Sequence, residues 1–430
     1  MRIVELTEST RKNVLNDLLR RSPNNYSEYE ETVNEILSNV KENGNKALFE
    51  YTLKFDRFQL TPENIRVTEE EIQEAYAQMD PQLVEVIRKS AANIRAFHEK
   101  QLRNSWFDAK EDGTILGMKI TPIGRVGVYV PGGKAAYPSS VLMNVIPAKV
   151  AGVSDIIMTT PPGADGKVNP GTLVAADIAG VGTIYKAGGA QAIAAMAYGT
   201  DSIPKVDKIT GPGNIFVALA KKAVYGYVSI DSIAGPSEIL VLADETANPR
   251  YVAADLLSQA EHDELASAIL ITTSRELAEQ VSAEVDVFTA QLSRREIIEK
   301  SLENYGYILL AENMEDAIET ANEIASEHLE ILTRNPFDTM TRIKNAGAIF
   351  LGEYSSEPLG DYFAGPNHIL PTNGTAKFFS PVNVDDFLKK TSIISYSREA
   401  LQAVHKDIER FAESEGLTAH ANSIRVRFES

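Results

Sequence analysis

A glutamate is followed directly by a histidine at two places in this chain, as Glu261-His262 and as Glu327-His328. The chain has 6 histidines and no cysteine in 430 residues, so these two pairs hold a large share of its capacity for metal binding and proton transfer. Imidazole and carboxylate groups can both ligate a metal or accept a proton. We interpret the first pair as part of a metal site and the second as an acid–base pair.

The absence of cysteine restricts how this chain could oxidise an aldehyde. Without a thiolate nucleophile, no thiohemiacetal can form on the protein. Such an oxidation would require water to add to the carbonyl group, and a base would have to activate that water.

The first pair lies close to a second candidate ligand. Gln259 precedes His262 by three residues, a spacing that places both side chains on one face of a helix. We predict that helix from Pro249, behind an Asn248 cap, to about His262. These two side chains can fill two positions of a Zn²⁺ ion, which prefers four. The other candidate ligands are distant in the sequence: Asp361, His368 and His420.

Two series of strands must position these side chains. From about residue 120 onward, short β-branched runs alternate with helical runs, which is typical of βαβ units and parallel sheets. Glu327 and His328 fall at the end of a predicted helix in the second series. We therefore expect an α/β fold with two tandem Rossmann-like parallel-sheet domains. The predicted strands are 125–130, 156–159, 183–186 and 208–210 in the first series, and 238–242, 268–272, 307–310 and 348–351 in the second.

The predicted domain boundaries follow from this order, because 430 residues exceed one ordinary core. Residues 1–23 are expected to form a helical N-terminal segment, and 24–105 are helical in pattern. We assign residues 24–128 and 238–380 to a first Rossmann-like domain and 129–237 to a second. Residues 381–430 are expected to form a small C-terminal domain, with a helix through 401–411 and a loop that carries His420.

Three glycine-rich turns follow strands of the first series, and the carboxyl ends of parallel strands share one edge of a sheet. Glycine turns occur in any βα loop, but here Tyr129, Gln191 and Asn214 accompany them, which favours a bound nucleotide. The pattern differs from the standard dinucleotide fingerprint, since Phe216 stands where a third glycine would be needed. The three turns are Pro131-Gly132-Gly133, Gly188-Gly189-Ala190-Gln191 and Gly211-Pro212-Gly213-Asn214.

The composition limits the classes of partner. A formal net charge of −18 disfavours nucleic acids and anionic membranes, which attract basic surfaces, so we expect neither as a partner. The N-terminus lacks the apolar core of a signal peptide, and no stretch is long and apolar enough to span a bilayer. We therefore expect a cytoplasmic enzyme, and its acidity suits a cationic small-molecule substrate.

Several long motifs resemble the signature of the histidinol dehydrogenase family. They are DSIAGPSEI at 231–239 and SQAEHD at 258–263, with YVPGG at 129–133, GPGN at 211–214, SEH at 326–328, GDYFAGPNH at 360–368 and EGL at 415–417. The resemblance covers essentially the whole chain, in order, and no functional position departs from it.

The resemblance implies oxidation of L-histidinol through the aldehyde to L-histidine with two NAD⁺, the last two steps of histidine biosynthesis. It implies a homodimer with a shared active site, in which the C-terminal segment crosses to the partner. The implied Zn²⁺ ligands, which also surround the substrate, are Gln259, His262, Asp361 and His420. The other implied contacts are Tyr129, Gln191 and Asn214 for NAD, and Ser237, His328, His368 and Glu415 for the substrate.

Within this resemblance, the metal holds the substrate by its nitrogens, His328 takes the alcohol proton, and Glu327 activates the water that hydrates the aldehyde. Three other functions remain open on the residues alone. They are a zinc hydrolase on the same fold, a zinc- and NAD-dependent dehydrogenase of another small amino or polyol alcohol, and a non-catalytic nucleotide-binding protein.

Overall fold

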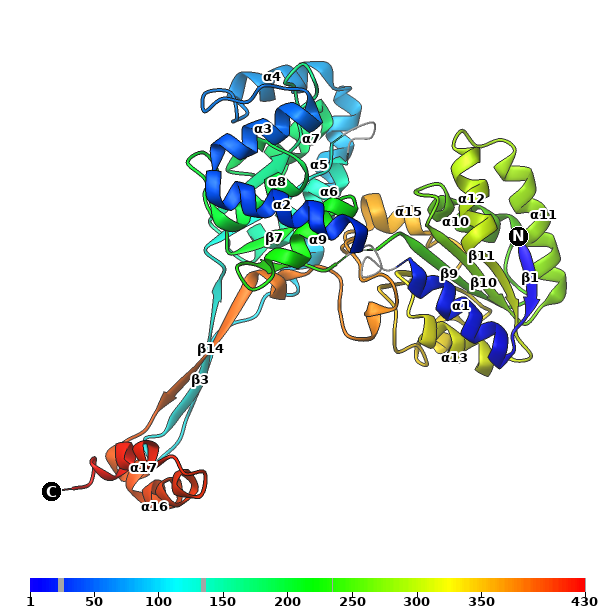
Figure 1. Cartoon of the computed structure of the whole chain (residues 1–430). Helices are drawn as coiled ribbons and strands as arrows, with labels where there is room; N and C mark the ends of the chain where they lie inside the picture. The colour runs from blue at the N-terminus through cyan, green and yellow to red at the C-terminus, as the bar shows by residue number, and fades with distance from the viewer. Residues whose placement is uncertain (22–26, 133–136, 234, 430) are drawn as a thin grey trace. The chain divides into compact units, whose positions relative to one another are not determined.

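The computed structural model describes residues 1–21, 27–132, 137–233 and 235–429, and Figure 1 traces the whole chain. It separates into two compact units. The larger consists of Met1–Gln101 and Ile123–Phe387, and the smaller of Leu102–Pro122 and Leu388–Ser430. Among the described residues, no helix is both long and apolar enough to cross a membrane.

The larger unit contains a six-stranded parallel sheet in the order β1-β11-β10-β9-β12-β13. Apolar clusters cover both of its faces, as expected for a parallel sheet between helices. Its strands are β1 (Arg2–Glu5), β9 (Glu238–Ala243), β10 (Ser267–Thr272), β11 (Gly306–Leu310), β12 (His328–Leu332) and β13 (Ala348–Leu351). Its helices are α1 (Glu8–Arg20), α10 (Pro249–Ala260), α11 (Arg275–Thr289), α12 (Arg295–Tyr305), α13 (Met314–Ile324) and α14 (Pro336–Met340).

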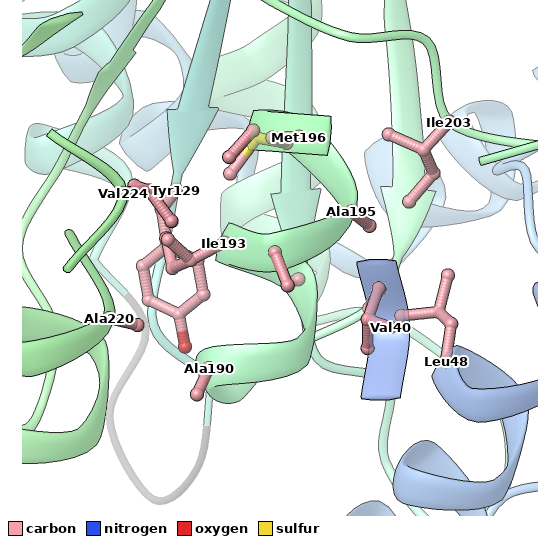
Figure 2. Packing of buried hydrophobic residues seen from close by; sticks show 14 of the residues in the cluster. Val40, Leu48, Tyr129, Ala190, Ile193, Ala195, Met196, Ile203, Ala220 and Val224 are labelled. Carbon is pink, nitrogen blue, oxygen red and sulfur yellow. The ribbon is translucent and has the colours of Figure 1, made fainter. Parts of the chain in front are cut away.

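The same unit contains a five-stranded parallel sheet in the order β6-β5-β4-β7-β8. Figure 2 shows part of its core, where Val40 and Leu48 belong to one apolar cluster with Tyr129, Ile193 and Met196. Its strands are β4 (Arg125–Tyr129), β5 (Asp155–Thr160), β6 (Thr183–Lys186), β7 (Lys208–Thr210) and β8 (Ser229–Ile230). The helices around it are α2 (Ser27–Asn43), α3 (Asn45–Asp56), α4 (Glu69–Gln78), α5 (Pro81–Glu99), α6 (Pro138–Val150), α7 (Pro170–Ala179), α8 (Gly189–Tyr198) and α9 (Ile215–Val224).

The smaller unit is an antiparallel sheet in the order β14-β3-β2, followed by two packed helices. Its elements are β2 (Trp106–Ala109), β3 (Ile115–Pro122), β14 (Leu388–Ser395), α16 (Arg398–Ser414) and α17 (Thr418–Arg425). The larger unit ends with short turns of helix at α15 (Glu357–Leu359), Gly360–Ala364, Thr375–Lys377 and Val384–Phe387.

The α/β fold with two parallel sheets is confirmed, and each strand predicted from about residue 120 onward is present within one or two residues. The turn chemistry explains the accuracy at several helix starts. Asn248 caps α10 by accepting a hydrogen bond from the Arg250 N–H at 3.0 Å, and Pro249 occupies the first turn. The helical pattern predicted for residues 24–105 is confirmed as four helices, separated at Gly44, at residues 57–68 and at Asp80-Pro81.

Four details of the prediction are wrong or incomplete. His328 begins strand β12 rather than ending a helix, because α13 stops at Ile324 behind Ala325 in the left-handed conformation. Helix α10 stops at Ala260, so His262 lies in the following turn. His420 lies on α17 rather than in a loop, and the N-terminal segment begins with strand β1, paired to β11.

Helices α2–α5 pack on α6–α9, around the five-stranded sheet. The sequence-based division instead groups residues 24–128 with residues 238–380. An amphipathic pattern shows that a helix face is buried, but it does not show against which sheet. The domain boundaries as a whole stay predictions.

Candidate functional site

A cavity of about 880 Å³ lies where strands of the five-stranded sheet end. All three glycine turns contribute to its wall, through Gly132, Gly189 and Asn214 among other residues. Tyr129 and Gln191 also line it. The expectation that these turns share one edge is therefore confirmed, because β4, β5, β6 and β7 are adjacent and parallel.

Close packing of backbone shapes this cavity. Gly211 follows β7 with φ of +120°, and a side chain there would overlap the Tyr129 carbonyl group. The Tyr129 hydroxyl accepts a hydrogen bond from the Gly189 N–H at 3.1 Å, and burial raises the pKa of Tyr129 to about 12. The hydroxyl therefore stays protonated and can donate its hydrogen to a ligand.

Polar groups at the cavity remain available for a ligand. Asn214 caps α9 through its side-chain oxygen, which accepts from the Phe216 and Val217 N–H groups at 3.1 and 3.2 Å, so its amide NH₂ is not used there. Asp56, at the end of α3, also lines the cavity, and one of its carboxylate oxygens is buried without a hydrogen-bond partner in the part of the chain that the structure describes. Burial raises the pKa of Asp56 to about 6.

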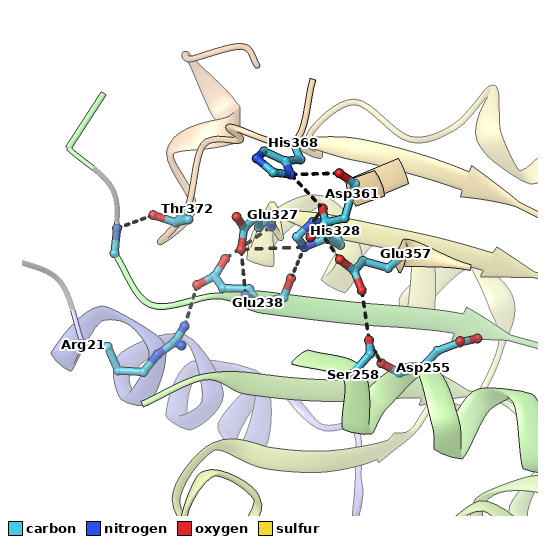
Figure 3. A network of polar contacts seen from close by, with 11 residues as sticks. Arg21, Glu238, Asp255, Ser258, Glu327, His328, Glu357, Asp361, His368 and Thr372 are labelled. Carbon is cyan, nitrogen blue, oxygen red and sulfur yellow. Dashed lines mark hydrogen bonds and ion pairs between the residues drawn. The ribbon is translucent and has the colours of Figure 1, made fainter. Parts of the chain in front are cut away.

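A second site lies at the amino ends of the adjacent strands β9 and β12 (Figure 3). The main-chain N–H of Glu238 donates to the Glu327 carboxylate at 2.9 Å. Nδ1 of His328 lies 2.9 Å from the Glu238 carbonyl oxygen, so it must carry the proton and donate it. Nε2 of His328 is then an unprotonated acceptor, and it is buried with no hydrogen-bond partner among the described residues.

Carboxylates surround the free Nε2 of His328. It lies 3.9 Å from both the Glu357 and the Asp361 carboxylates, and these three side chains can offer ligand atoms that lie within 4.8 Å of one another. Burial lowers the pKa of His328 to about 4, so the imidazole is neutral near pH 7. Burial, and then the charge of Asp361, raises the pKa of Glu357 to about 7, and burial raises that of Asp361 to about 6.

These residues fit a divalent cation. Within the described part of the chain, one carboxylate oxygen of Glu357 is buried without a partner. Both polar atoms of the Gln259 amide are likewise buried and unpartnered there, and the residue is 1% exposed. Next to Gln259, the Ser258 hydroxyl donates to the Glu357 carboxylate at 3.1 Å. Burial and neighbouring carboxylates also raise the pKa of Glu327 well above its usual range. A bound cation would satisfy the unpartnered oxygens of Glu357 and Gln259 and lower these raised pKa values.

Most of the other predicted site residues of this unit join the same cluster. His368 lies with Nδ1 3.6 Å from the Asp361 carboxylate, and burial lowers its pKa to about 4. The charge of His262 acts on the pKa values of His328, His368 and Glu357, which places it near them although its side chain is exposed. Ser237 directly precedes Glu238 and is half-buried.

Glu415 and His420 belong to the smaller unit. Glu415 caps the end of α16, and His420 lies on α17. Both line a hollow of about 640 Å³ between these helices, with Phe411 and Leu417 as apolar neighbours. Their roles toward metal and substrate stay predictions.

Sequence reasoning missed several members of the cluster in Figure 3, among them Glu357, Glu238 and Arg21. Glu357 precedes Asp361 by four residues, a spacing that brings carboxylates together on a helical segment and could have identified it. The motif of residues 231–239 contains Glu238, but nothing in the sequence indicated that its main chain would contact Glu327 and His328. Arg21 lies more than 200 residues away from its partner Glu238.

The chain has two parallel β-sheets, with a cavity beyond the carboxyl ends of one and an imidazole–carboxylate cluster at the other. This arrangement is that of an α/β enzyme with a candidate metal site. A family model for histidinol dehydrogenase matches residues 19–428. The chain therefore belongs to the histidinol dehydrogenase family, a family of oxidoreductases.

Individual relatives agree over nearly the whole length. Histidinol dehydrogenase of Bacillus subtilis is 60% identical over 400 residues, 93% of each chain. That of Caldanaerobacter subterraneus subsp. tengcongensis is 55% identical over 429 residues, 99% of each chain. The crystal structure of histidinol dehydrogenase from Elizabethkingia anophelis superposes with a TM-score of 0.93 at 40% identity, covering 99% of this chain and 98% of that one.

Proposed function

We propose that this chain oxidises L-histidinol to L-histidine through L-histidinaldehyde, using two NAD⁺, the last two steps of histidine biosynthesis. The observation that carries the proposal is the buried, unprotonated Nε2 of His328 among the Glu357 and Asp361 carboxylates, in a chain of this family. The chain has no cysteine that would require an oxidising compartment, and we propose a cytoplasmic location.

Metal and cofactor have separate candidate sites. Gln259, His262 and Asp361 would hold Zn²⁺, together with His420, and the ion would supply positions for the imidazole and amino nitrogens of the substrate. The cavity at Tyr129, Gln191 and Asn214 would hold NAD⁺, which accepts the hydride. The unpartnered amide of Gln259 and the free polar groups of the cavity support these assignments.

The chain's own residues would move the protons. Nε2 of His328 would accept the alcohol proton, because its Nδ1–H donates to the Glu238 carbonyl and the ring is neutral near pH 7. Glu327 would activate the water that hydrates the aldehyde. One of its carboxylate oxygens accepts from the Glu238 N–H, and the other is left for water. His368 and Ser237 would contact the substrate.

The proposal includes a homodimer with a shared site, in which Glu415 and His420 complete the site of the partner. The acidic carboxylate of Glu415 would contact the substrate, and the His420 imidazole would complete four ligand positions on the metal. The hollow between α16 and α17, in which both side chains stand, supports a joint role.

The division of labour between the two bases can be tested by Glu327→Gln. We expect oxidation of L-histidinaldehyde to slow by about 10²–10⁴-fold and oxidation of L-histidinol much less, since only the first requires activated water. Each half-reaction is followed separately by NADH absorbance, with L-histidine detected by mass spectrometry. The control is Glu319→Gln, an exposed carboxylate on α13. Equal slowing of both half-reactions would refute the assignment.

A further inference from the structure

We propose that Glu238 is the positioning residue for both bases, and that Arg21 holds Glu238 in place. The inference rests on the proposed function, because it concerns the alignment of Glu327 and His328. Figure 3 shows Arg21, Glu238, Glu327 and His328 joined by successive contacts. None of the four is more than 8% exposed, so water does not compete for these contacts.

The main chain of Glu238 contacts both bases. Its N–H donates to the Glu327 carboxylate at 2.9 Å, and its carbonyl oxygen accepts from Nδ1 of His328 at 2.9 Å. The second contact fixes the tautomer of His328, which leaves Nε2 as the acceptor. The first contact fixes one carboxylate oxygen of Glu327. One residue at the start of β9 therefore orients both groups.

The side chain of Glu238 also contacts the segment that contains Glu327. Its carboxylate accepts from the main-chain N–H of Glu327 at 3.4 Å and also from the N–H of Asn373. Glu238 and Glu327 thus exchange hydrogen bonds in both directions, side chain to main chain. This reciprocal pair fixes the relative position of the amino ends of β9 and β12, in addition to the ladder of the sheet.

Arg21 supplies the charge that this buried carboxylate needs. Its Nη2 donates to Glu238 at 2.5 Å, and its Nη1 donates to the Leu265 carbonyl oxygen at 2.7 Å. The guanidinium group also lies over the Tyr305 ring, 5.2 Å from its centroid. Leu265 is three residues beyond His262, so Arg21 connects the candidate metal-binding turn to the strand that orients the bases.

The alternative explanation is that Arg21 and Glu238 form a purely structural ion pair. The contacts distinguish this explanation from a positioning role. A structural pair requires only that its charges are compensated, and replacing both partners by neutral groups of similar size is often tolerated. A positioning residue also requires its specific acceptors. Glutamine at position 238 has one acceptor oxygen, so it cannot satisfy Arg21 and the Glu327 N–H with separate oxygens. Catalysis and stability should therefore respond differently to the double substitution.

The test compares Glu238→Gln with the double variant Arg21→Met/Glu238→Gln, in zinc-loaded full-length protein. We expect kcat for both half-reactions to fall about 10–100-fold in both variants, a part of the 10²–10⁴-fold contributed by general bases. KM and the dissociation constant for L-histidinol, measured calorimetrically without NAD⁺, should stay within about 3-fold. The melting temperature should fall in Glu238→Gln and recover in the double variant, because no uncompensated charge remains.

The control removes another largely buried ion pair, Lys208 and Asp386, as Lys208→Met/Asp386→Asn. It should keep kcat within about 2-fold, since neither residue contacts the bases. The inference is overturned if kcat recovers together with the melting temperature, if KM rises while kcat is unchanged, or if the control loses kcat equally. Absence of NADH formation by the unmodified protein would instead overturn the proposed function.

Discussion

The side chains around His328 combine high burial with an excess of carboxyl groups. Glu238, Glu327 and Glu357 are each less than 10% exposed, and Asp361 stands beside them. Burial raises the pKa values of all four carboxyl groups, and the charge of Arg21 offsets part of this increase at Glu238. Such a group is costly to ionise without a nearby positive charge. These buried carboxyl groups therefore favour the binding of a cation.

Glu357 is the residue whose role the sequence did not reveal, and its substitution by glutamine tests the cation site. We expect the affinity for Zn²⁺ to fall about 10–100-fold, as for other groups that support metal ligands. The measurement is a competition titration with a fluorescent chelator, independent of activity. Glu353→Gln, on an exposed residue nearby, is the matched control. An unchanged zinc affinity would remove Glu357 from the site.

Asp56 gives a pH dependence with a definite sign. Burial raises its pKa in the folded protein to about 6 from 3.8, so the folded state holds this proton more tightly than the unfolded state. Its contribution to stability is present below pH ~4 and is lost as the pH rises through about 6. Asp56→Asn should therefore match the unmodified protein near pH 4 and melt about 1–3 °C higher at pH 7, measured by thermal unfolding across this range. A constant difference at all pH values would contradict this assignment.

The large cavity lies at the carboxyl ends of its strands, whereas the cluster around His328 lies at the amino ends of its strands. The glycine turns follow β4, β6 and β7, so the large cavity lies beyond carboxyl ends. Glu238 and His328 are instead the first residues of β9 and β12. The first residues of two adjacent strands leave side chains and main-chain groups free to pair with each other, as Glu238 and Glu327 do.

Gly211→Ala tests how closely the backbone must pack at the cavity. Both Gly211 and Gly226 have positive φ, but only Gly211 faces another backbone group, at Tyr129. Alanine should cost roughly 1–2 kcal/mol at either position from the backbone conformation. Gly211→Ala should in addition weaken NADH binding at least about 10-fold, measured by NADH fluorescence. Equal NADH affinity in Gly211→Ala and Gly226→Ala would contradict the close-approach argument.

Periodicity and turn chemistry were sufficient to predict eight strands from residue 125 onward and the edge shared by the glycine turns, but they did not predict β8, β12 or β14. They were not sufficient for the cluster at β12. Its components come from residues 21, 238, 327, 357 and 361, and only tertiary packing determines that these meet. The three-residue helix α15 and the five-residue helical turn Gly360–Ala364 were too short for a periodic signal. Arg21 gave no signal because its partner is remote in sequence.

The whole molecule consists of two compact units, and the predicted site residues divide between them. Gln259, His262 and Asp361 belong to the larger unit, whereas Glu415 and His420 belong to the smaller. Exposed apolar side chains such as Phe107, Ile394 and Phe411 lie on the smaller unit, which suits an interface with a second copy. In the proposed dimer, the residues that the larger and the smaller unit contribute to one site come from different chains.

Complementation between inactive variants tests this sharing. Glu327→Gln and His420→Ala should each be nearly inactive alone in the formation of L-histidine, which is the activity to be assayed. If the site is shared between chains, a mixed dimer of the two contains one intact site, so random pairing should restore about a quarter of the activity. Co-expression with two different tags and assay of the purified mixture provide the measurement. No restored activity in mixed dimers would show that each chain completes its own site.

The four-electron oxidation that we propose depends on a metal. The ratio of NADH formed to L-histidinol consumed tests both features of this reaction. The measurement uses purified protein with limiting substrate, with and without a chelator. Our account predicts two NADH for each L-histidinol, with L-histidine as the product and loss of both oxidations on chelation. A ratio of one, no NADH at all, or full activity after complete removal of the metal would contradict it.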